Sequence, residues 1–136
     1  MKTHLLRTSL LAVVAAVSVH AQNSNFKVNI PFDFIVGSQT LPAGQYSVGV
    51  PTITGVVTIN CVDHKGASLM IGTLPQSAVG AQNEEKLVFH RYNNTYFLAN
   101  IWGAGSYGRQ LSTTKREQEL AGRRPDPDSL TVVASR

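Results

Sequence analysis

Apolar side chains occupy every second position from Phe26 to Val36, and this alternation constrains the fold more than any other feature of the sequence. The apolar positions are Phe26, Val28, Ile30, Phe32, Phe34 and Val36. Polar residues or proline lie between them, except at Ile35. A period of two is typical of a β-strand with one buried and one solvated face. Pro31 cannot donate a ladder hydrogen bond, so it predicts an edge strand or a bend between two short strands.

Several later segments also have the composition of strands separated by turn residues. Strands are predicted at 45–50, 56–62, 67–71, 86–92 and 95–102. Asp63 to Gly66 fits a hairpin loop with Gly66 at positive φ, and Asn93-Asn94 fits a tight hairpin turn. The segment 74–83 is predicted to be a looser connection. Six to seven short strands at this spacing indicate an all-β fold, an antiparallel sandwich or barrel.

One short helix is predicted near the carboxyl end. Thr114 and Glu117 have the spacing of a capping box, and the helix is expected over 115–121 with Gly122 as its stop. A helix this short must pack on the sheet to persist. Residues 130–133 are then either a last strand or part of a loose tail. The expected organisation is a signal peptide over 1–21, a single β-rich domain over 22–122 and a tail over 123–136.

The first residues have the pattern of a cleaved secretory signal. Lys2 and Arg7 precede an apolar run that begins at Leu10, and small side chains at Val19 and Ala21 flank His20. The run is shorter than the roughly 20 residues that a membrane-spanning helix needs. We therefore expect cleavage after Ala21, no membrane span in the mature chain, and a location in the periplasm or outside the cell.

Charge and cysteine content exclude two further classes. Removal of Lys2 and Arg7 takes two positive charges from the formal net charge of +4, leaving +2. A balance so close to neutral gives no electrostatic argument for nucleic-acid binding. Cys61 is the only cysteine, so no intramolecular disulfide can form. We expect it to be a small buried side chain on a strand.

No catalytic, metal or cofactor site is predicted. Residues 103–108 match G-x-G-x-x-G, but no helix signal follows directly, as a dinucleotide site requires, so a flexible glycine loop is expected. His64 and His90, the histidines that remain after cleavage, lack the spacing of metal ligands. Glu84-Glu85 is a pair of neighbours that a strand would turn to opposite faces. The prediction is therefore no enzyme and no cofactor.

Aromatic residues gather around the last predicted hairpin and the glycine loop. Trp102, Tyr107, Tyr96 and Arg109 are the candidate ligand-binding residues, since aromatic faces on exposed strands or loops bind sugars. Cross-strand aromatic pairs that stabilise a hairpin would explain the same tyrosines and tryptophan. Both interpretations stay open at this stage.

Several segments together resemble a group of small exported β-rich proteins of soil bacteria. The resemblance rests on PFDF at 31–34, LPAGQYSV at 41–48, KLVFHRY at 86–92, YFL at 96–98, IW at 101–102 and KRE at 115–117. It covers most of residues 28–121, and the tail after Gly122 lies outside it. It implies export and a β fold, and it transfers no catalytic or binding residues.

The function expected is that of a non-enzymatic, exported structural or interaction module. Its surfaces would be the 103–109 loop and any edge strand left open by Pro31, which could accept a strand from an unidentified partner protein. The alternative is a module that binds carbohydrate or another envelope polymer through Trp102 and Tyr107. A small hydrolase is the third hypothesis. It requires His64 or His90 within hydrogen-bond reach of a carboxylate, with a nucleophile in the same cleft.

Overall fold

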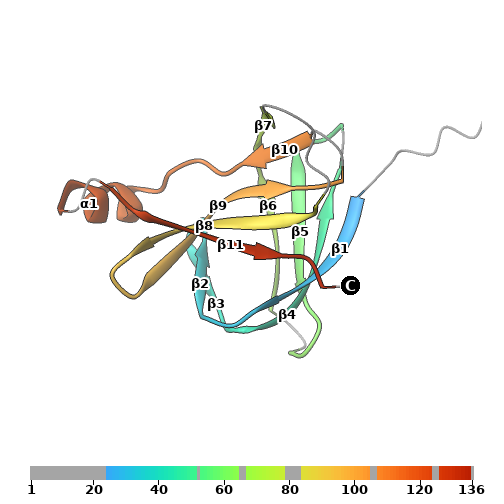
Figure 1. The fold of residues 1–136 in the computed structure, drawn as a ribbon, viewed down its shortest axis with the longest axis horizontal. Helices are drawn as coiled ribbons and strands as arrows, with labels where there is room; N and C mark the ends of the chain where they lie inside the picture. Colours follow the sequence, from blue (N-terminus) through green and yellow to red (C-terminus); the bar gives the residue numbers. More distant parts are fainter. Residues whose placement is uncertain are drawn as a thin grey trace, which may run out of the picture.

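The computed structural model describes residues 24–51, 53–64, 67–78, 84–104, 107–123 and 126–135. The predicted signal peptide and Gly66 lie outside these ranges. The described residues form eleven strands and one short helix, arranged as two sheets that curl into a half-barrel (Figure 1). The all-β class with one helix near the carboxyl end is therefore confirmed.

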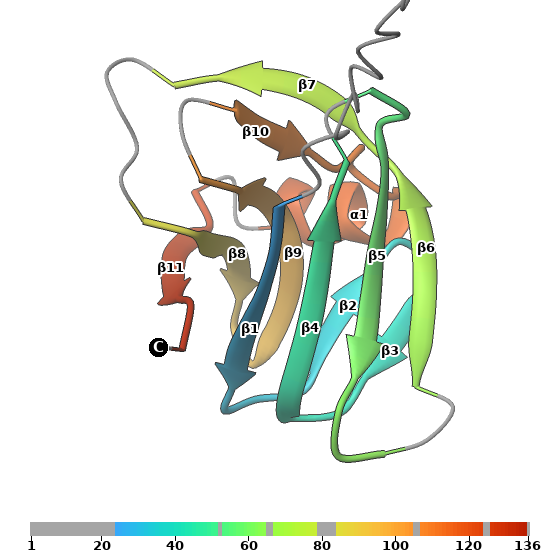
Figure 2. The same ribbon diagram turned by 90° about the vertical axis from the view of Figure 1, so that its right-hand side faces the viewer.

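The two sheets are built from different parts of the chain. Sheet A has the order β1-β4-β5-β6, and its four strands run side by side in Figure 2: β1 (Ser24–Ile30), β4 (Gly44–Val50), β5 (Val56–Cys61) and β6 (Ser68–Gly72). Sheet B has the order β11-β8-β9-β10-β7: β11 (Asp128–Val133), β8 (Lys86–Tyr92), β9 (Thr95–Trp102), β10 (Tyr107–Gln110) and β7 (Leu74–Ser77). The short β2 (Phe34–Val36) pairs with β3 (Gln39–Leu41) and, in parallel, with β9.

The alternation after residue 25 is divided by a bend at Pro31. β1 ends at Ile30 and β2 begins at Phe34, so the predicted split into two short strands is confirmed. Asp33 lies within the bend, and its Oδ1 accepts a hydrogen bond of 2.9 Å from the backbone N–H of Ala43. This contact ties the bend to the turn that precedes β4.

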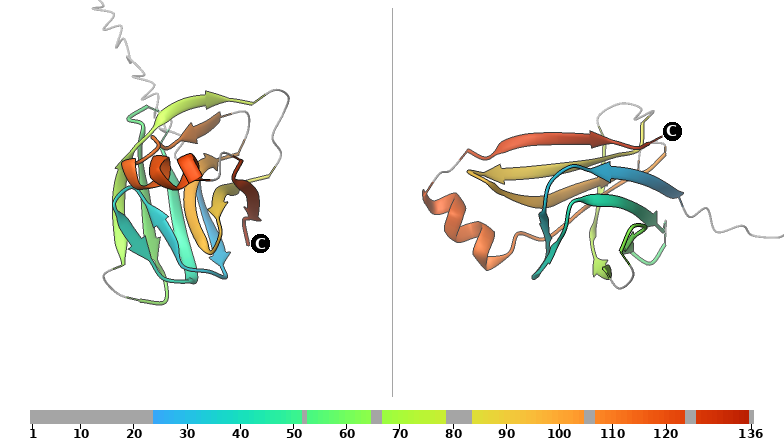
Figure 3. Two further views of the ribbon diagram at one scale, coloured as in Figure 1. Left: turned by 90° about the vertical axis from the view of Figure 1, so that its left-hand side faces the viewer. Right: turned by 90° about the horizontal axis from the view of Figure 1, so that it is seen from below.

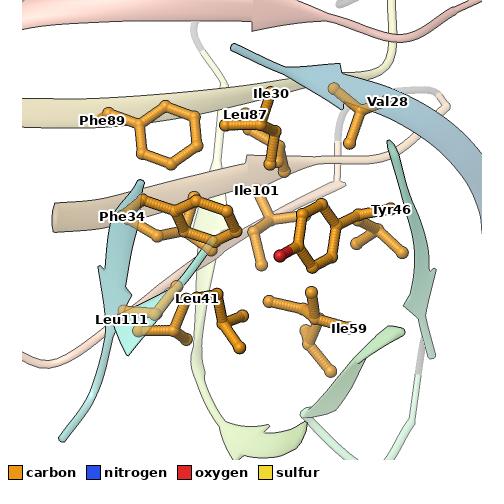
Figure 4. Packing of buried hydrophobic residues seen from close by; sticks show 14 of the residues in the cluster. Val28, Ile30, Phe34, Leu41, Tyr46, Ile59, Leu87, Phe89, Ile101 and Leu111 are labelled. Carbon is orange, nitrogen blue, oxygen red and sulfur yellow. The ribbon is translucent and has the colours of Figure 1, made fainter. Parts of the chain in front are cut away.

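The core lies between the two sheets (Figure 4). Leu87, Phe89 and Ile101 from sheet B and Val28, Tyr46 and Ile59 from sheet A are all fully buried. Phe34 stands edge-on to Tyr46 and to Phe89, with ring centroids 5.2 and 5.5 Å apart. The hydroxyl of Tyr46 donates to the carbonyl oxygen of Pro42 at 2.5 Å, so the polar tip of this buried ring has a partner.

The chain is divided into more strands than the six to seven expected. The strands without a predicted counterpart are β3, β7 and β10. The prediction of a loose connection was wrong for 74–77, and the prediction of a glycine loop was wrong for 107–109. β7 and β10 pair with each other across a separation of about thirty residues, and neither segment alternates clearly enough to be recognised alone.

The helix α1 (Lys115–Arg123) lies at one end of the molecule, on the face of sheet B turned away from sheet A (Figure 3). We call this the outer face of sheet B. The hydroxyl of Thr114 accepts a hydrogen bond of 3.2 Å from the N–H of Glu117, as the predicted cap requires. The helix continues through Gly122, the predicted stop. Leu120 and Ala121 pack against three buried side chains of the sheet, Ile35, Tyr92 and Phe97.

The carboxyl-terminal segment forms the last strand that the sequence left open. β11 pairs with β8 along its whole length. Beyond it, the N–H of Ala134 donates to the carbonyl of Glu85 at 2.9 Å, and the N–H of Ser135 donates to the carbonyl of Lys27 at 2.8 Å. Residues 134–135 therefore join sheet B to β1. The edge of β1 that Pro31 was expected to leave open is partly occupied by this segment.

Candidate functional site

A group of half-exposed side chains occupies the outer face of sheet B at the end away from α1. Leu87 and Ile101 point into the core, so their neighbours Lys86 and Trp102 point outward. The register places Lys86 opposite Trp102, Trp102 opposite Gly108 and Gly108 opposite Gln76. We call this surface the Trp102 face; its residues are Gln76, Lys86, Val88, Asn100, Trp102, Gly108 and Gln110.

The indole of Trp102 lies directly on Gly108. A Cβ atom added to Gly108 would come within 2.5 Å of Cε3 and of Cζ3 of the indole, closer than real Cβ contacts. Only a glycine leaves room for the ring in this position. The indole is therefore held across the strands of sheet B, half-buried, rather than projecting away from them.

Polar groups that can form hydrogen bonds surround the ring. The Asn100 amide nitrogen donates to the Gln76 side-chain oxygen, which fixes the orientation of both amides. Lys86 stands opposite Trp102 on β8, and Gln110 is exposed on β10. Amides offer both donors and acceptors, and an ammonium offers three donors. Such groups beside an aromatic ring can bind the hydroxyls of a sugar while the ring packs against its C–H groups.

Tyr96 does not belong to the Trp102 face. It lies near the opposite end of β9, about 20 Å away along the strand. Its ring stacks on Phe32, with centroids 4.0 Å apart and an interplanar angle of 17°, and it packs against the core. Of the two interpretations left open by the sequence, the structure therefore agrees with structural packing for Tyr96.

Arg109 is also separated from Trp102, because the two side chains leave opposite faces of sheet B. Arg109 pairs in register with Ile101, whose side chain is in the core, and its Nη2 donates to the carbonyl of Pro51 at 3.0 Å. The guanidinium thus connects sheet B to the end of β4. Tyr107 is the first residue of β10, and its side chain lies outside what the structure describes.

A second polar cluster lies under α1 and was missed by the sequence analysis as a site. Nδ1 of His90 is 3.1 Å from Oε1 of Glu117, and the Tyr92 hydroxyl donates to the same oxygen at 3.4 Å. Glu117 is buried, whereas the His90 side chain is 36% exposed. The sequence identified Glu117 only as a cap residue, because its partners lie in β8, 25 and 27 residues away.

The His90–Glu117 contact meets one requirement of the hydrolase hypothesis, a histidine beside a carboxylate. Burial, with the charge and hydrogen bond of Glu117, raises the pKa of Tyr92. The Glu117 carboxylate also fastens α1 to the sheet, since both of its partners are on β8. His64 is exposed in the connection between β5 and β6.

Within the described ranges, no three His, Cys, Asp or Glu side chains are grouped as metal ligands. No helix in the same ranges is long and apolar enough to cross a membrane. The last glycine of G-x-G-x-x-G, Gly108, lies in β10, whereas a dinucleotide site would place it in a helix. Cys61 is half-buried at the end of β5 and packs against the core.

Comparison with known proteins gives no relative from which a function could be transferred: no family model, no curated protein and no solved structure matches the chain.

Proposed function

We propose that this protein is a non-enzymatic, exported binding module that holds a carbohydrate or another envelope polymer on the Trp102 face. The observation that carries the proposal is the indole of Trp102, seated on Gly108 and flanked by the paired amides of Asn100 and Gln76. Export is supported by the signal-peptide pattern of residues 1–21.

The half-exposed position of Trp102 suits the binding of a ligand better than it suits stabilisation of the fold. A tryptophan that served only the fold would gain most from complete burial, as Phe97 does under α1. Trp102 keeps part of its ring exposed on a surface that carries amides and one lysine. Tryptophan is enriched among the residues that dominate binding energies because it combines a large apolar area with few rotatable bonds.

The first experiment uses the single tryptophan as its probe. Residues 22–136 are titrated with laminarin, soluble xylan, dextran and chitin oligosaccharides while Trp102 emission and acrylamide quenching are followed. Binding of one polymer should shift the emission to shorter wavelength and reduce quenching, because the sugar covers the exposed ring face. Emission and quenching that stay constant with every polymer would contradict the carbohydrate proposal.

Affinity electrophoresis in gels containing the polymer then tests the residues without relying on fluorescence. Trp102→Ala should weaken retardation at least ~10-fold, the effect expected of a central binding residue. Gly108→Ala should weaken it too, since the new methyl group displaces the indole. Val62→Ala is the matched control, because Val62 is an exposed apolar residue that follows β5 and lies outside the Trp102 face. Equal retardation of all variants would show that the polymer binds elsewhere.

The His90–Glu117 contact supports a hydrolase as the second candidate. Its test is the release of reducing ends from the same polymers. We expect none. Product release that is lost in His90→Ala, with the fold retained, would replace the binding proposal by the hydrolase.

A further inference from the structure

Most exposed strand edges of the described sheets are protected from pairing with another chain. β1 and β11 lie beside each other, and the N–H of Ser135 donates to Lys27 at this seam. β7 contains Pro75, which lacks a backbone donor, and β3 is only three residues long. Covering segments, proline and shortness are the usual ways in which proteins prevent edge-to-edge association.

The edge of β6 has none of these features. Its sequence, Ser68–Gly72, contains neither a charged residue nor proline. Its register with β5 is regular, and in the described part of the chain β5 is its one neighbour in the sheet. Met70, at its centre, is an apolar side chain that is 72% exposed.

The hydrogen-bond pattern shows which backbone groups face outward at this edge. The N–H of Cys61 donates to Ala67 and the N–H of Thr73 donates to Gly55, so these two pairs are of the hydrogen-bonded kind. Hydrogen-bonded and non-hydrogen-bonded pairs alternate along an antiparallel ladder. Leu69 and Ile71 therefore bond to β5, whereas Ser68, Met70 and Gly72 direct their N–H and C=O groups away from it.

We infer that β6 pairs antiparallel with β6 of a second copy of this chain, around a two-fold axis at Met70. In that register Met70 faces the partner's Met70, and Ser68 faces the partner's Gly72. All the outward backbone groups then find complementary donors and acceptors. The result is one continuous sheet built from sheet A of both copies.

The side chains of β6 and its lack of charged residues favour a second copy of this chain as the partner that pairs with its edge. On the core side of the strand, Leu69 meets the partner's Ile71, and both are apolar and only partly buried in the single chain. On the other side the exposed Met70 side chains cover each other, and glycine opposite serine leaves no steric conflict. No like charges meet, since β6 has none. Pairing of one short strand buries less than a standard interface, so the dimer is a reversible, concentration-dependent one.

The test is sedimentation velocity of residues 22–136 between about 1 μM and 1 mM, the range in which small interfaces associate. The wild type should shift from monomer to dimer. Met70→Lys should weaken association at least ~10-fold, because two ammonium groups then meet at the axis. Ile53→Lys is the matched control, because it introduces the same charge at an apolar residue that is 80% exposed and lies outside β6. A monomer at all concentrations, or a dimer unaffected by Met70→Lys, would overturn the inference.

Amide hydrogen exchange followed by NMR identifies the edge itself. With rising protein concentration, exchange should slow at Ser68, Met70 and Gly72. Leu69 and Ile71, bonded to β5 in the single chain, should exchange slowly at every concentration. Slowing that is confined to another strand would place the dimer interface elsewhere and contradict pairing through β6.

Discussion

The outer face of sheet B carries a large aromatic residue near each end, and the two are used differently. Phe97 is buried beneath α1, where Leu120 and Ala121 pack on it. Trp102, about 16 Å further along the same strand, lies half-buried on Gly108 at the end that α1 does not reach. The helix thus buries the apolar residues at one end of the face, whereas the other end stays half-exposed, and there we propose that a ligand binds.

The largest expected effect tests this division directly. Phe97→Ala should lower the free energy of unfolding by about 3–5 kcal/mol, because it leaves a cavity beneath the helix. Trp102→Ala should cost less than about 2 kcal/mol, because its ring is already partly in water. Urea unfolding followed by circular dichroism measures both. Similar losses would show that the two aromatics serve the fold equally.

A second, smaller effect is expected from the carboxylate beneath the helix. Glu117→Ala should cost about 1–3 kcal/mol, because the Tyr92 hydroxyl and His90 lose their shared acceptor. Glu119→Ala, an exposed change in the same helix, should stay within about 0.5 kcal/mol of wild type. Retardation in polymer gels should be the same for both. If Glu117→Ala abolished retardation while the fold persisted, the two ends of the face would act as one site.

The smallest effect concerns alkaline pH. Tyr92 has a raised pKa in the folded protein, so the folded state holds this proton more tightly than the unfolded chain does. The stability that this tighter proton binding contributes is present below the tyrosine pKa of the unfolded chain, about 10, and is lost as pH rises above that pKa. Tyr92→Phe should cost about 0.5–1.5 kcal/mol at pH 7.

The same substitution should also make the loss of stability above pH 10 shallower. Part of the alkaline loss should remain, since burial also raises the pKa of Tyr46. Urea midpoints at pH 7, 9 and 11 provide the measurement. Parallel pH profiles for wild type and Tyr92→Phe would contradict the linkage.

Features that depend on local sequence were predictable. The alternation around Phe26, the bend at Pro31 and the cap at Thr114 were all expected from neighbouring residues alone. The turn after β8 follows the same rule, since Asn93 adopts the left-handed conformation with φ 56°.

The candidate site was only partly predictable, because its geometry depends on partners far along the chain. The sequence identified Trp102 as a candidate binding residue. The packing of its indole on Gly108 could be predicted only if residues 107–110 were recognised as a strand. Because 107–109 was predicted to be a loop, Arg109 was grouped with Trp102. In a strand, neighbours such as Gly108 and Arg109 point to opposite faces. Glu117 and His90 meet only because α1 returns to β8.

The bonds made by Ala134 and Ser135 also bear on the order of folding. They join β1 to a segment that follows every other described strand, so this seam cannot close until all the strands between them are available. Contacts of such long sequence separation slow folding, because the chain loses the entropy of loop closure before the contact contributes any stability. We therefore expect the contact between β1 and residues 134–135 to form late in folding, after the local pairings within sheet A.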